Sequence, residues 1–284
     1  GPEASPDGRW IACSVTEPAY DDAAKSSDIW IVPADGSQPP RKLTAGKAGE
    51  SDVAWSPDST RIAFTAKREG DDENQAYVLQ LVNGGDAQRV TNLVGGASAP
   101  VWSPDGRKLL VTTRVYAGTR NDTENRKLHE ERKARKYNAR TYDAFPIRHW
   151  DRWLDELQPT LVVQSLDAGA EPRDLLGGTA VRASRGYGGR LGNSGESLDA
   201  DWTPDGAAVV FAATTERDQA ARAHVGLALW QVSAEGGEPR RLTDPGRDYS
   251  QPGFTPDGRR LLAKAERVSQ QWVYNATRLV QWSW

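Results

Sequence analysis

The sequence predicts an all-β fold, a β-propeller of four-stranded blades with one largely helical insertion. The main observation is a turn tetrapeptide, Ser/Thr-Pro-Asp-Gly/Ser, which occurs at 5–8, 56–59, 103–106, 203–206 and 255–258. Its prolines are separated by 51, 47, 100 and 52 positions, a period near 50 with one interval doubled. Repeats of this length that are built from short strands are typical of propeller blades.

Each tetrapeptide has the composition of a tight turn between two strands. Pro fixes φ at the second position, Asp bonds its own backbone and Gly tolerates a positive φ. Short runs that end in an aromatic residue precede the turns, as in Val53-Ala54-Trp55. Runs of strand-forming residues such as 61–65 follow the turns. We expect the aromatic residue to pack between neighbouring blades. Helical repeats would instead need an apolar face with a period of 3.6 residues.

Two further runs complete each unit. The third strand is expected at 29–32, 77–81, 161–163 and 229–232, and the fourth at 41–44, 88–91 and 240–243, where the chain reads RKLT, QRVT and RRLT. The predicted blades are therefore approximately 1–44, 52–91, 98–176, 198–243 and 248–284. The fifth blade lacks the closing strand, so we expect an incomplete ring with two open blade edges. Such edges favour association, so we expect the chain to form homo-oligomers or other aggregates.

Composition excludes several classes of partner. The 284 residues are 37% hydrophobic and 26% charged, with a net charge of -3. Binders of nucleic acid or anionic membranes are usually clearly basic, so we expect neither partner. No apolar run reaches about 18 residues. The chain has no Met, and Gly1 precedes a repeat motif almost at once, so we interpret it as a fragment that lacks its natural start.

The single cysteine, Cys13, lies in an apolar run. One cysteine allows neither an internal disulfide nor a cysteine metal cluster. We interpret Cys13 as a small buried strand residue; a free nucleophile is the alternative.

The doubled interval is interpreted as an insertion at 114–159, because this segment has neither the alternation of strands nor a turn tetrapeptide. Residues 120–140 carry eight Lys or Arg and four Asp or Glu, which predicts an exposed helix, with a polyanion site as the alternative. His129 begins HEERK, but Lys133 stands where a zinc helix needs its second histidine. We expect no metal site and no cofactor.

The second half of the insertion, RTYDAFPIRHWDRWLDELQP, mixes aromatic, acidic and basic residues densely. We do not interpret His149 and Asp151 as a catalytic dyad, because no activated Ser or Cys motif accompanies them. The sequence has no G-x-S-x-G, and GNSGE at 192–196 has the wrong spacing for a nucleophile elbow.

These motifs together carry a resemblance to a known family. The SPDG turns, DIWIVPADG and RKLT, followed by Y-D-x-x-x-x-R-H-W-D-x-W at 142–153, resemble the propeller of prolyl oligopeptidase family serine peptidases, in the dipeptidyl peptidase 5 and acylaminoacyl peptidase branch. The resemblance covers essentially the whole chain. It implies a propeller that caps an α/β-hydrolase domain with a Ser-Asp-His triad. That domain is absent here, so we expect no catalytic residue and no peptidase activity in this chain.

The resemblance also implies a partner, a location and a site. The propeller would gate and orient short peptides for its own missing hydrolase domain, and exported relatives favour a periplasmic or secreted location over a cytoplasmic one. A peptide ammonium needs carboxylates, and peptide carbonyls need rigid donors such as Arg. The candidates are Arg148, Asp151, Asp155 and Glu156. In the alternative interpretation, Trp150 and Trp153 dock the insertion on the blade rim and the charges only cap it.

Two departures from the family pattern affect this site. The closing strand of the third blade is degenerate at Arg173-Asp174-Leu175-Leu176, and the loop at 182–197 is rich in glycine where relatives carry an acidic, aromatic run. The blade pattern is also compatible with two other functions: a TolB-like propeller that binds a protein partner, and a propeller enzyme with its site in the central channel. The long insertion argues against the first, and the mostly Ala, Val, Pro and Gly residues of the first strands argue against the second.

Overall fold

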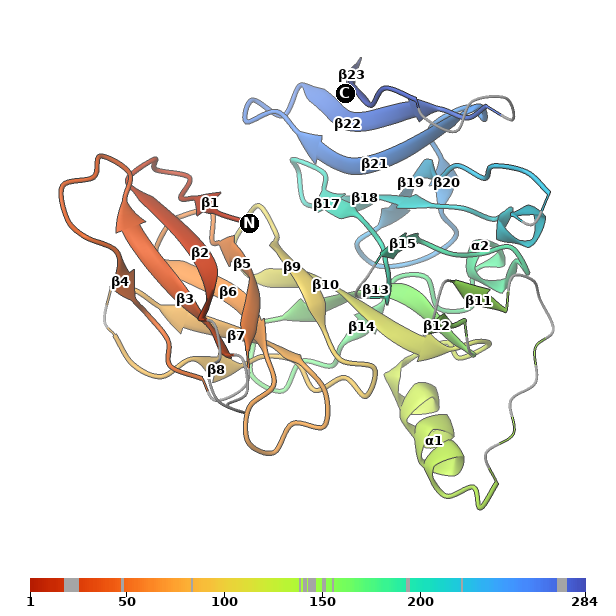
Figure 1. Ribbon diagram of the computed structural model, residues 1–284, viewed down its shortest axis with the longest axis horizontal. Helices are drawn as coiled ribbons and strands as arrows, with labels where there is room; N and C mark the ends of the chain where they lie inside the picture. Colours follow the sequence, from red (N-terminus) through yellow and green to blue (C-terminus); the bar gives the residue numbers. More distant parts are fainter. Residues whose placement is uncertain are drawn as a thin grey trace. The chain divides into compact units, whose positions relative to one another are not determined.

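The computed structural model describes all residues except 18–25, 47–48, 83, 138, 140–141, 143–146, 150–151, 155, 193–194, 221 and 270–274. The described residues form five antiparallel sheets of three or four strands and two short ribbons (Figure 1). The predicted all-β class, with four-stranded repeating units, is confirmed. The chain divides into two compact units, one of residues 1–113 and 163–172, the other of 114–162 and 173–284.

The first unit contains two complete blades. The first consists of β1 (Glu3–Ala4), β2 (Trp10–Glu17), β3 (Ser26–Pro33) and β4 (Arg41–Lys42), and the second of β5 (Glu50–Trp55), β6 (Arg61–Ala66), β7 (Gln75–Gln80) and β8 (Gln88–Arg89). Each closing strand is only two residues long. The threonine that follows it extends the pairing: Oγ1 of Thr44 accepts from the N–H of Ile29 at 2.9 Å, and Oγ1 of Thr91 accepts from that of Ala76 at 2.8 Å.

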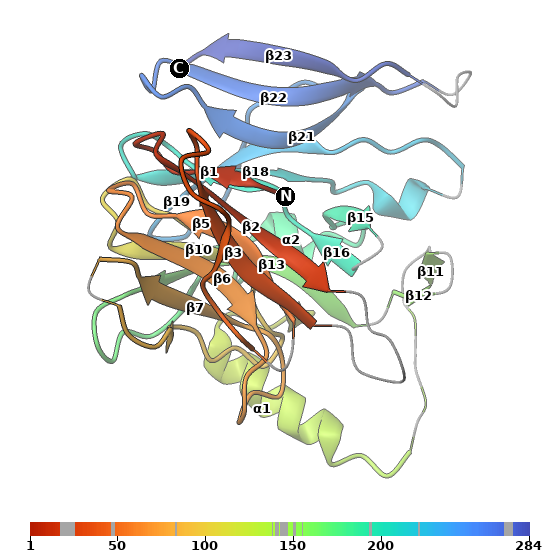
Figure 2. The ribbon, with the colours of Figure 1, turned by 60° about the vertical axis from the view of Figure 1, so that its left-hand side comes forward.

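Trp55, the aromatic residue before the second turn, packs between the first two blades, as predicted. Trp55 belongs to one buried cluster with Ala12 and Ile29 of the first blade, and its indole N–H donates to the carbonyl of Glu3 at 3.0 Å. Figure 2 shows β2 and β3 beside β5 and β6. The indole thus adds a directed hydrogen bond to apolar burial, which sets how the two sheets stack.

The third sheet has the order β14-β13-β10-β9, with β9 at Ser98–Trp102, β10 at Lys108–Tyr116, β13 at Leu157–Ser165 and β14 at Arg173–Asp174. The segment between β10 and β13 holds helix α1 (Asp122–Lys133) and a ribbon of β11 (Arg148–His149) and β12 (Arg152–Trp153). The doubled interval is therefore an insertion within one blade.

Helix α1 begins where the sequence supplies a cap. The side chain of Asn121 accepts from the N–H of Glu124 at 2.9 Å, and Asp122 and Glu124 place negative charge in the first turn. Arg132 and Lys133 lie in the last turn, where positive charge is favourable. The helix is shorter than the predicted 120–140.

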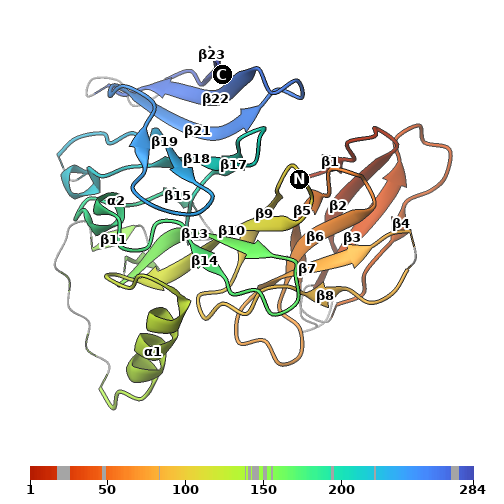
Figure 3. The same cartoon turned by 180° about the vertical axis from the view of Figure 1, so that it is seen from behind.

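The second unit contains a fourth and a fifth blade. The fourth consists of β17 (Ala200–Trp202), β18 (Ala208–Ala213), β19 (Ala228–Ser233) and β20 (Arg240–Arg241), and the fifth of β21 (Arg247–Phe254), β22 (Arg260–Arg267) and β23 (Arg278–Ser283). Their facing sides bury one cluster that includes Val210, Leu229, Tyr249 and Leu261. Figure 3 shows β21 to β23 stacked on β17, β18 and β19. Ahead of them lie α2 (Ala180–Ala183) and a hairpin of β15 (Arg190–Gly192) and β16 (Gly195–Ser197).

All five tetrapeptides form the predicted turn. In each, the Ser or Thr hydroxyl donates to the Asp carboxylate at 2.5 to 2.6 Å. The fourth residue has a positive φ, 67° to 71° at the four glycines and 59° at Ser59. These hydrogen bonds lower the pKa of every turn aspartate, to about 2 at Asp7 and Asp58.

The structure also describes the surroundings of the single cysteine and the character of the helices. Cys13 lies in β2 opposite Trp30, and it is half-buried rather than fully buried. None of the helices in the described residues has the length and apolar character needed to cross a membrane.

Candidate functional site

The β11–β12 ribbon of the insertion presents an arginine over an aromatic ring. Arg148 and Trp153 are cross-strand partners in the β11–β12 ribbon, and Cζ of Arg148 lies 5.8 Å from the centroid of the Trp153 ring. The ring of Tyr142 lies 5.9 Å from that of Trp153. Trp153 is 49% exposed, and Arg148 is also exposed. The ribbon therefore offers both guanidinium donors and an aromatic surface to an incoming molecule.

The other three predicted site residues are placed differently. Asp151 and Asp155, together with Trp150, lie outside the described residues. Glu156 forms an ion pair with Arg132 of α1, and its carbonyl accepts from the N–H of Ala117 at 3.0 Å. Within the described part of the chain, no hydrogen bond or ion pair joins Arg148 to Glu156. Their roles in substrate binding stay predictions.

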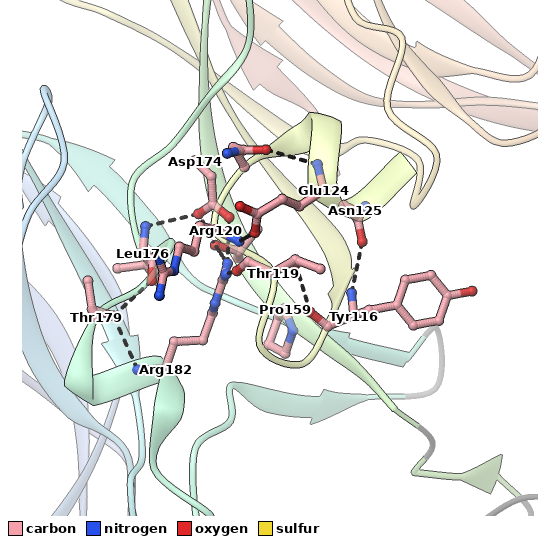
Figure 4. A network of polar contacts seen from close by, with 12 residues as sticks. Tyr116, Thr119, Arg120, Glu124, Asn125, Pro159, Asp174, Leu176, Thr179 and Arg182 are labelled. Atoms are coloured by element: carbon pink, nitrogen blue, oxygen red, sulfur yellow. Dashed lines mark hydrogen bonds and ion pairs between the residues drawn. The ribbon is translucent and has the colours of Figure 1, made fainter. Parts of the chain in front are cut away.

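A buried ion pair anchors the base of the insertion (Figure 4). Arg182 is 3% exposed, and its Nη1 lies 2.5 Å from Oδ2 of Asp174. Its Nη2 donates to the carbonyl of Thr119, just after β10. The hydroxyl of Thr160 donates to Asp174 at 2.6 Å and accepts from Arg182 at 3.2 Å. Arg182 thus connects β13, β14 and the start of the insertion.

This network explains the degenerate closing strand. The N–H of Leu175 still donates to the carbonyl of Leu161 at 2.9 Å, as in the regular blades, so strand pairing is kept. Asp174 occupies the position that Lys42 holds in the RKLT strand of the first blade, and its carboxylate forms the ion pair with Arg182. The short helix α2 that carries Arg182 is held in turn by Glu238, whose carboxylate accepts from the N–H groups of Ala180 and Val181 at 2.9 and 3.2 Å.

The glycine-rich loop is explained by close backbone packing. A Cβ at Gly186 would lie 2.3 Å from the carbonyl oxygen of Thr215, and a Cβ at Gly189 would lie 2.0 Å from that of Ser197. Arg217 pairs with the buried carboxylate of Glu196, which also accepts from the N–H of Gly189 at 2.6 Å. The glycines are therefore required for a compact, charge-paired loop.

The same loop delivers Arg190 to the start of β21. Its Nη2 donates to the carbonyl of Tyr249 at 2.9 Å and lies 3.3 Å from the carboxylate of Asp248. Its Nε lies 3.6 Å from the carboxylate of Asp199. Sequence reasoning did not find this cluster. Its local signal is an arginine that directly follows two glycines, because the two carboxylates come from positions 9 and 58 residues away.

Asp201, in the first strand of the fourth blade, has a raised pKa. Asp201 of β17 accepts from the N–H of Trp202 at 2.8 Å and faces Gly253 of β21. Burial raises the pKa of Asp201 to about 6. As for metals, the described residues contain no group of three or more His, Cys, Asp or Glu side chains that could hold an ion.

Comparison with known proteins identifies the kind of domain. Residues 1–134 match the family described as the TolB beta propeller domain. The peptidase YuxL of Bacillus subtilis is 30% identical over 227 residues, which cover 78% of this chain and 31% of that protein. The chain is a β-propeller, and its first half is similar to the TolB beta propeller domain. Dipeptidyl-peptidase 5 of Porphyromonas endodontalis is 27% identical to this propeller over 262 residues, 90% of this chain and 35% of that protein.

A solved structure supports the same fold. The acylaminoacyl peptidase of Pyrococcus horikoshii superposes with a TM-score of 0.59 at 15% sequence identity, over 95% of this propeller and 36% of that chain. The resemblance to the dipeptidyl peptidase 5 and acylaminoacyl peptidase branch is thus confirmed. This propeller spans about a third of the length of the curated relatives named above.

Proposed function

We propose that the chain is the non-catalytic propeller of a serine exopeptidase of the dipeptidyl or acylaminoacyl type. In this proposal it gates and orients short peptides for an α/β-hydrolase domain that carries the Ser-Asp-His triad, and the chain alone has no activity. The observation that carries the proposal is the similarity to dipeptidyl-peptidase 5 over 90% of this chain, a stretch too long to leave out the insertion.

The insertion supplies the groups that such a role needs. The guanidinium of Arg148 is a rigid donor for peptide carbonyls, and the exposed face of Trp153 offers apolar contact to a side chain. Asp151 and Asp155 are the proposed carboxylates for the peptide ammonium. The ion pair of Glu156 with Arg132 supports a positioning role for Glu156, since it ties the end of the insertion to α1.

The test uses the full-length gene product and short chromogenic peptides with free or acylated N-termini. Arg148→Gln and Trp153→Ala should each raise KM by about tenfold, roughly 1.4 kcal/mol of binding, with a smaller change in kcat. Lys127→Gln, an exposed change on α1, is the matched control and should leave both constants unchanged. Equal kcat/KM for all three variants would show that the ribbon does not contact the substrate.

A second function has one observation in its favour. The match of residues 1–134 to the TolB beta propeller domain also fits a propeller that binds a protein partner. A full-length protein that hydrolyses none of the peptides under any condition would favour this alternative. The preference between free and acylated N-termini separates the dipeptidyl from the acylaminoacyl type.

A further inference from the structure

A pocket of about 330 Å³ lies between the fourth and fifth blades of the second unit. Its walls are the connection 242–246 that leads from β20 to β21, Arg247 and Tyr249 of β21, Arg267 of β22 and Trp282 of β23. The volume lies at the lower end of the range for small-molecule sites, roughly 300 to 1,000 Å³.

Two arginines face each other in this pocket. Arg247 and Arg267 are cross-strand partners in the β21–β22 pair. The alternation of a strand places Arg247 on the same face as the buried Tyr249. Both arginines are exposed, and neither guanidinium has a hydrogen-bond or ion-pair partner among the described residues. Like charges directly opposite in a sheet are destabilising, so an anion bound between the two guanidinium groups would lower their repulsion.

The pocket also has an aromatic wall. The rings of Tyr249 and Trp282 lie 5.8 Å apart at an interplanar angle of 52°, and Tyr249 is 6% exposed. Burial raises the pKa of Tyr249, so its hydroxyl stays protonated at neutral pH and can donate. This wall can take the apolar body of a ligand whose charged end lies at the arginines.

The charge of the lining favours a single negative charge on the ligand. The charged lining residues are Arg247, Arg267 and Asp244, with a sum of one positive charge. The nearby Arg241 is already engaged, because its Nε donates to the carbonyl of Thr243 at 2.9 Å and its Cζ lies 5.8 Å from the Trp230 ring centroid. The Asp244 carboxylate would repel a phosphate dianion more strongly than a carboxylate.

We propose that this pocket binds a small organic carboxylate with an aromatic or aliphatic body. Its carboxylate lies between Arg247 and Arg267, and its body lies against Tyr249 and Trp282. Planar guanidinium groups suit this partner because they bind carboxylates through paired hydrogen bonds. The inference does not depend on the proposed peptidase function. A free acylated amino acid and the C-terminus of a short peptide share this chemistry.

Calorimetric titration of the 284-residue chain at neutral pH tests the site. N-acetyl-phenylalanine should bind saturably, and its uncharged amide, phenyl phosphate and inorganic phosphate should each bind at least tenfold more weakly. N-acetyl-Gly-Gly-Phe distinguishes the two sources: equal or tighter binding identifies a peptide C-terminus, and binding at least tenfold weaker identifies a free acylated amino acid.

Variants of the pocket give the second arm of the test. Arg247→Gln and Arg267→Gln should each weaken binding of N-acetyl-phenylalanine at least tenfold, while Arg259→Gln, an exposed change in the turn just before β22, should not. Thermal melting confirms that all three variants are folded. Absence of saturable binding, equal binding of the acid and its amide, or equal affinities of the Arg247 and Arg259 variants would each overturn the proposal.

Discussion

The carboxylate of Asp199 accepts a hydrogen bond from the backbone N–H of Gln251, one blade further along the chain, at 3.0 Å. Asp52 accepts in the same way from the N–H of Ala99 at 3.2 Å. Gln251 and Ala99 both have a φ of 48° and lie where the strand register shifts. An aspartate in or just before the first strand of one blade thus holds the bulged residue of the next, once in each compact unit.

This relationship predicts the effect of removing the Asp199 carboxylate. Asp199→Ala should lower the free energy of unfolding by about 0.5 to 1.5 kcal/mol, because it removes the hydrogen bond from the exposed Gln251 N–H and the ion pair with Arg190. Asp199→Asn keeps an acceptor and should cost less. Denaturant unfolding measures both, with Asp86→Ala in an exposed loop as the control. A loss no larger than that of the control would contradict the bulge account.

Asp201 should make stability depend on pH between about 4 and 6. Its folded pKa of about 6 lies above the ordinary value of 3.8, so the folded state binds more protons in this window. The stability that Asp201 contributes is then fully present below pH 4 and is lost as pH rises through 6, by at most about 3 kcal/mol. Asp201→Asn removes this dependence, so it should raise the melting temperature at pH 8 but not at pH 4. An equal effect at both pH values would show that the carboxyl titrates normally.

The turn aspartates change stability with pH in the direction opposite to Asp201, because their pKa values are lowered. The hydroxyl of Ser56, together with the backbone and side chain of Thr60, holds the pKa of Asp58 at about 2. Because this folded value lies below the unfolded one, the stability it contributes is present above pH 4 and is lost as pH falls through 2. Asp58→Asn should therefore flatten the acid limb of a stability-versus-pH curve. An unchanged limb would assign acid unfolding to other carboxylates.

The buried pair of Arg182 and Asp174 should be sensitive to removal of either partner. Arg182→Met leaves the carboxylate of Asp174 buried without its charge partner, which typically costs about 3 to 5 kcal/mol. The double variant Arg182→Met with Asp174→Leu should recover part of this loss. Chemical denaturation of the two single variants and the double variant measures the coupling. Additive losses would mean that the two side chains stabilise the fold independently.

The blades were predictable because their signal is local and repeated. Pro, Asp and Gly within four residues define a turn, and the aromatic residue at Trp55 and Trp102 precedes it at a fixed distance. The insertion and the helix after Asn121 were also predictable, from a broken period and from charge. The end of the helix at Lys133 was less predictable from the sequence, because the residues that follow it are also helix formers.

The clusters around Arg182 and Arg190 could not be predicted in the same way. Arg190 meets Asp248 across 58 positions of sequence, and Arg182 meets the carbonyl of Thr119 across 63. Such contacts depend on how sheets stack, which no short motif encodes. The glycines at 186, 188 and 189 indicated close backbone packing, but they did not identify the residues against which the loop packs.

The most direct measurement is hydrolysis of short peptides by the full-length gene product and, side by side, by the 284-residue chain. The account predicts that the full-length protein releases dipeptides or acylated amino acids, that the chain alone releases neither, and that Arg148→Gln lowers kcat/KM in the full-length protein. Peptide hydrolysis by the chain alone, or a full-length protein inactive on every peptide, would contradict it.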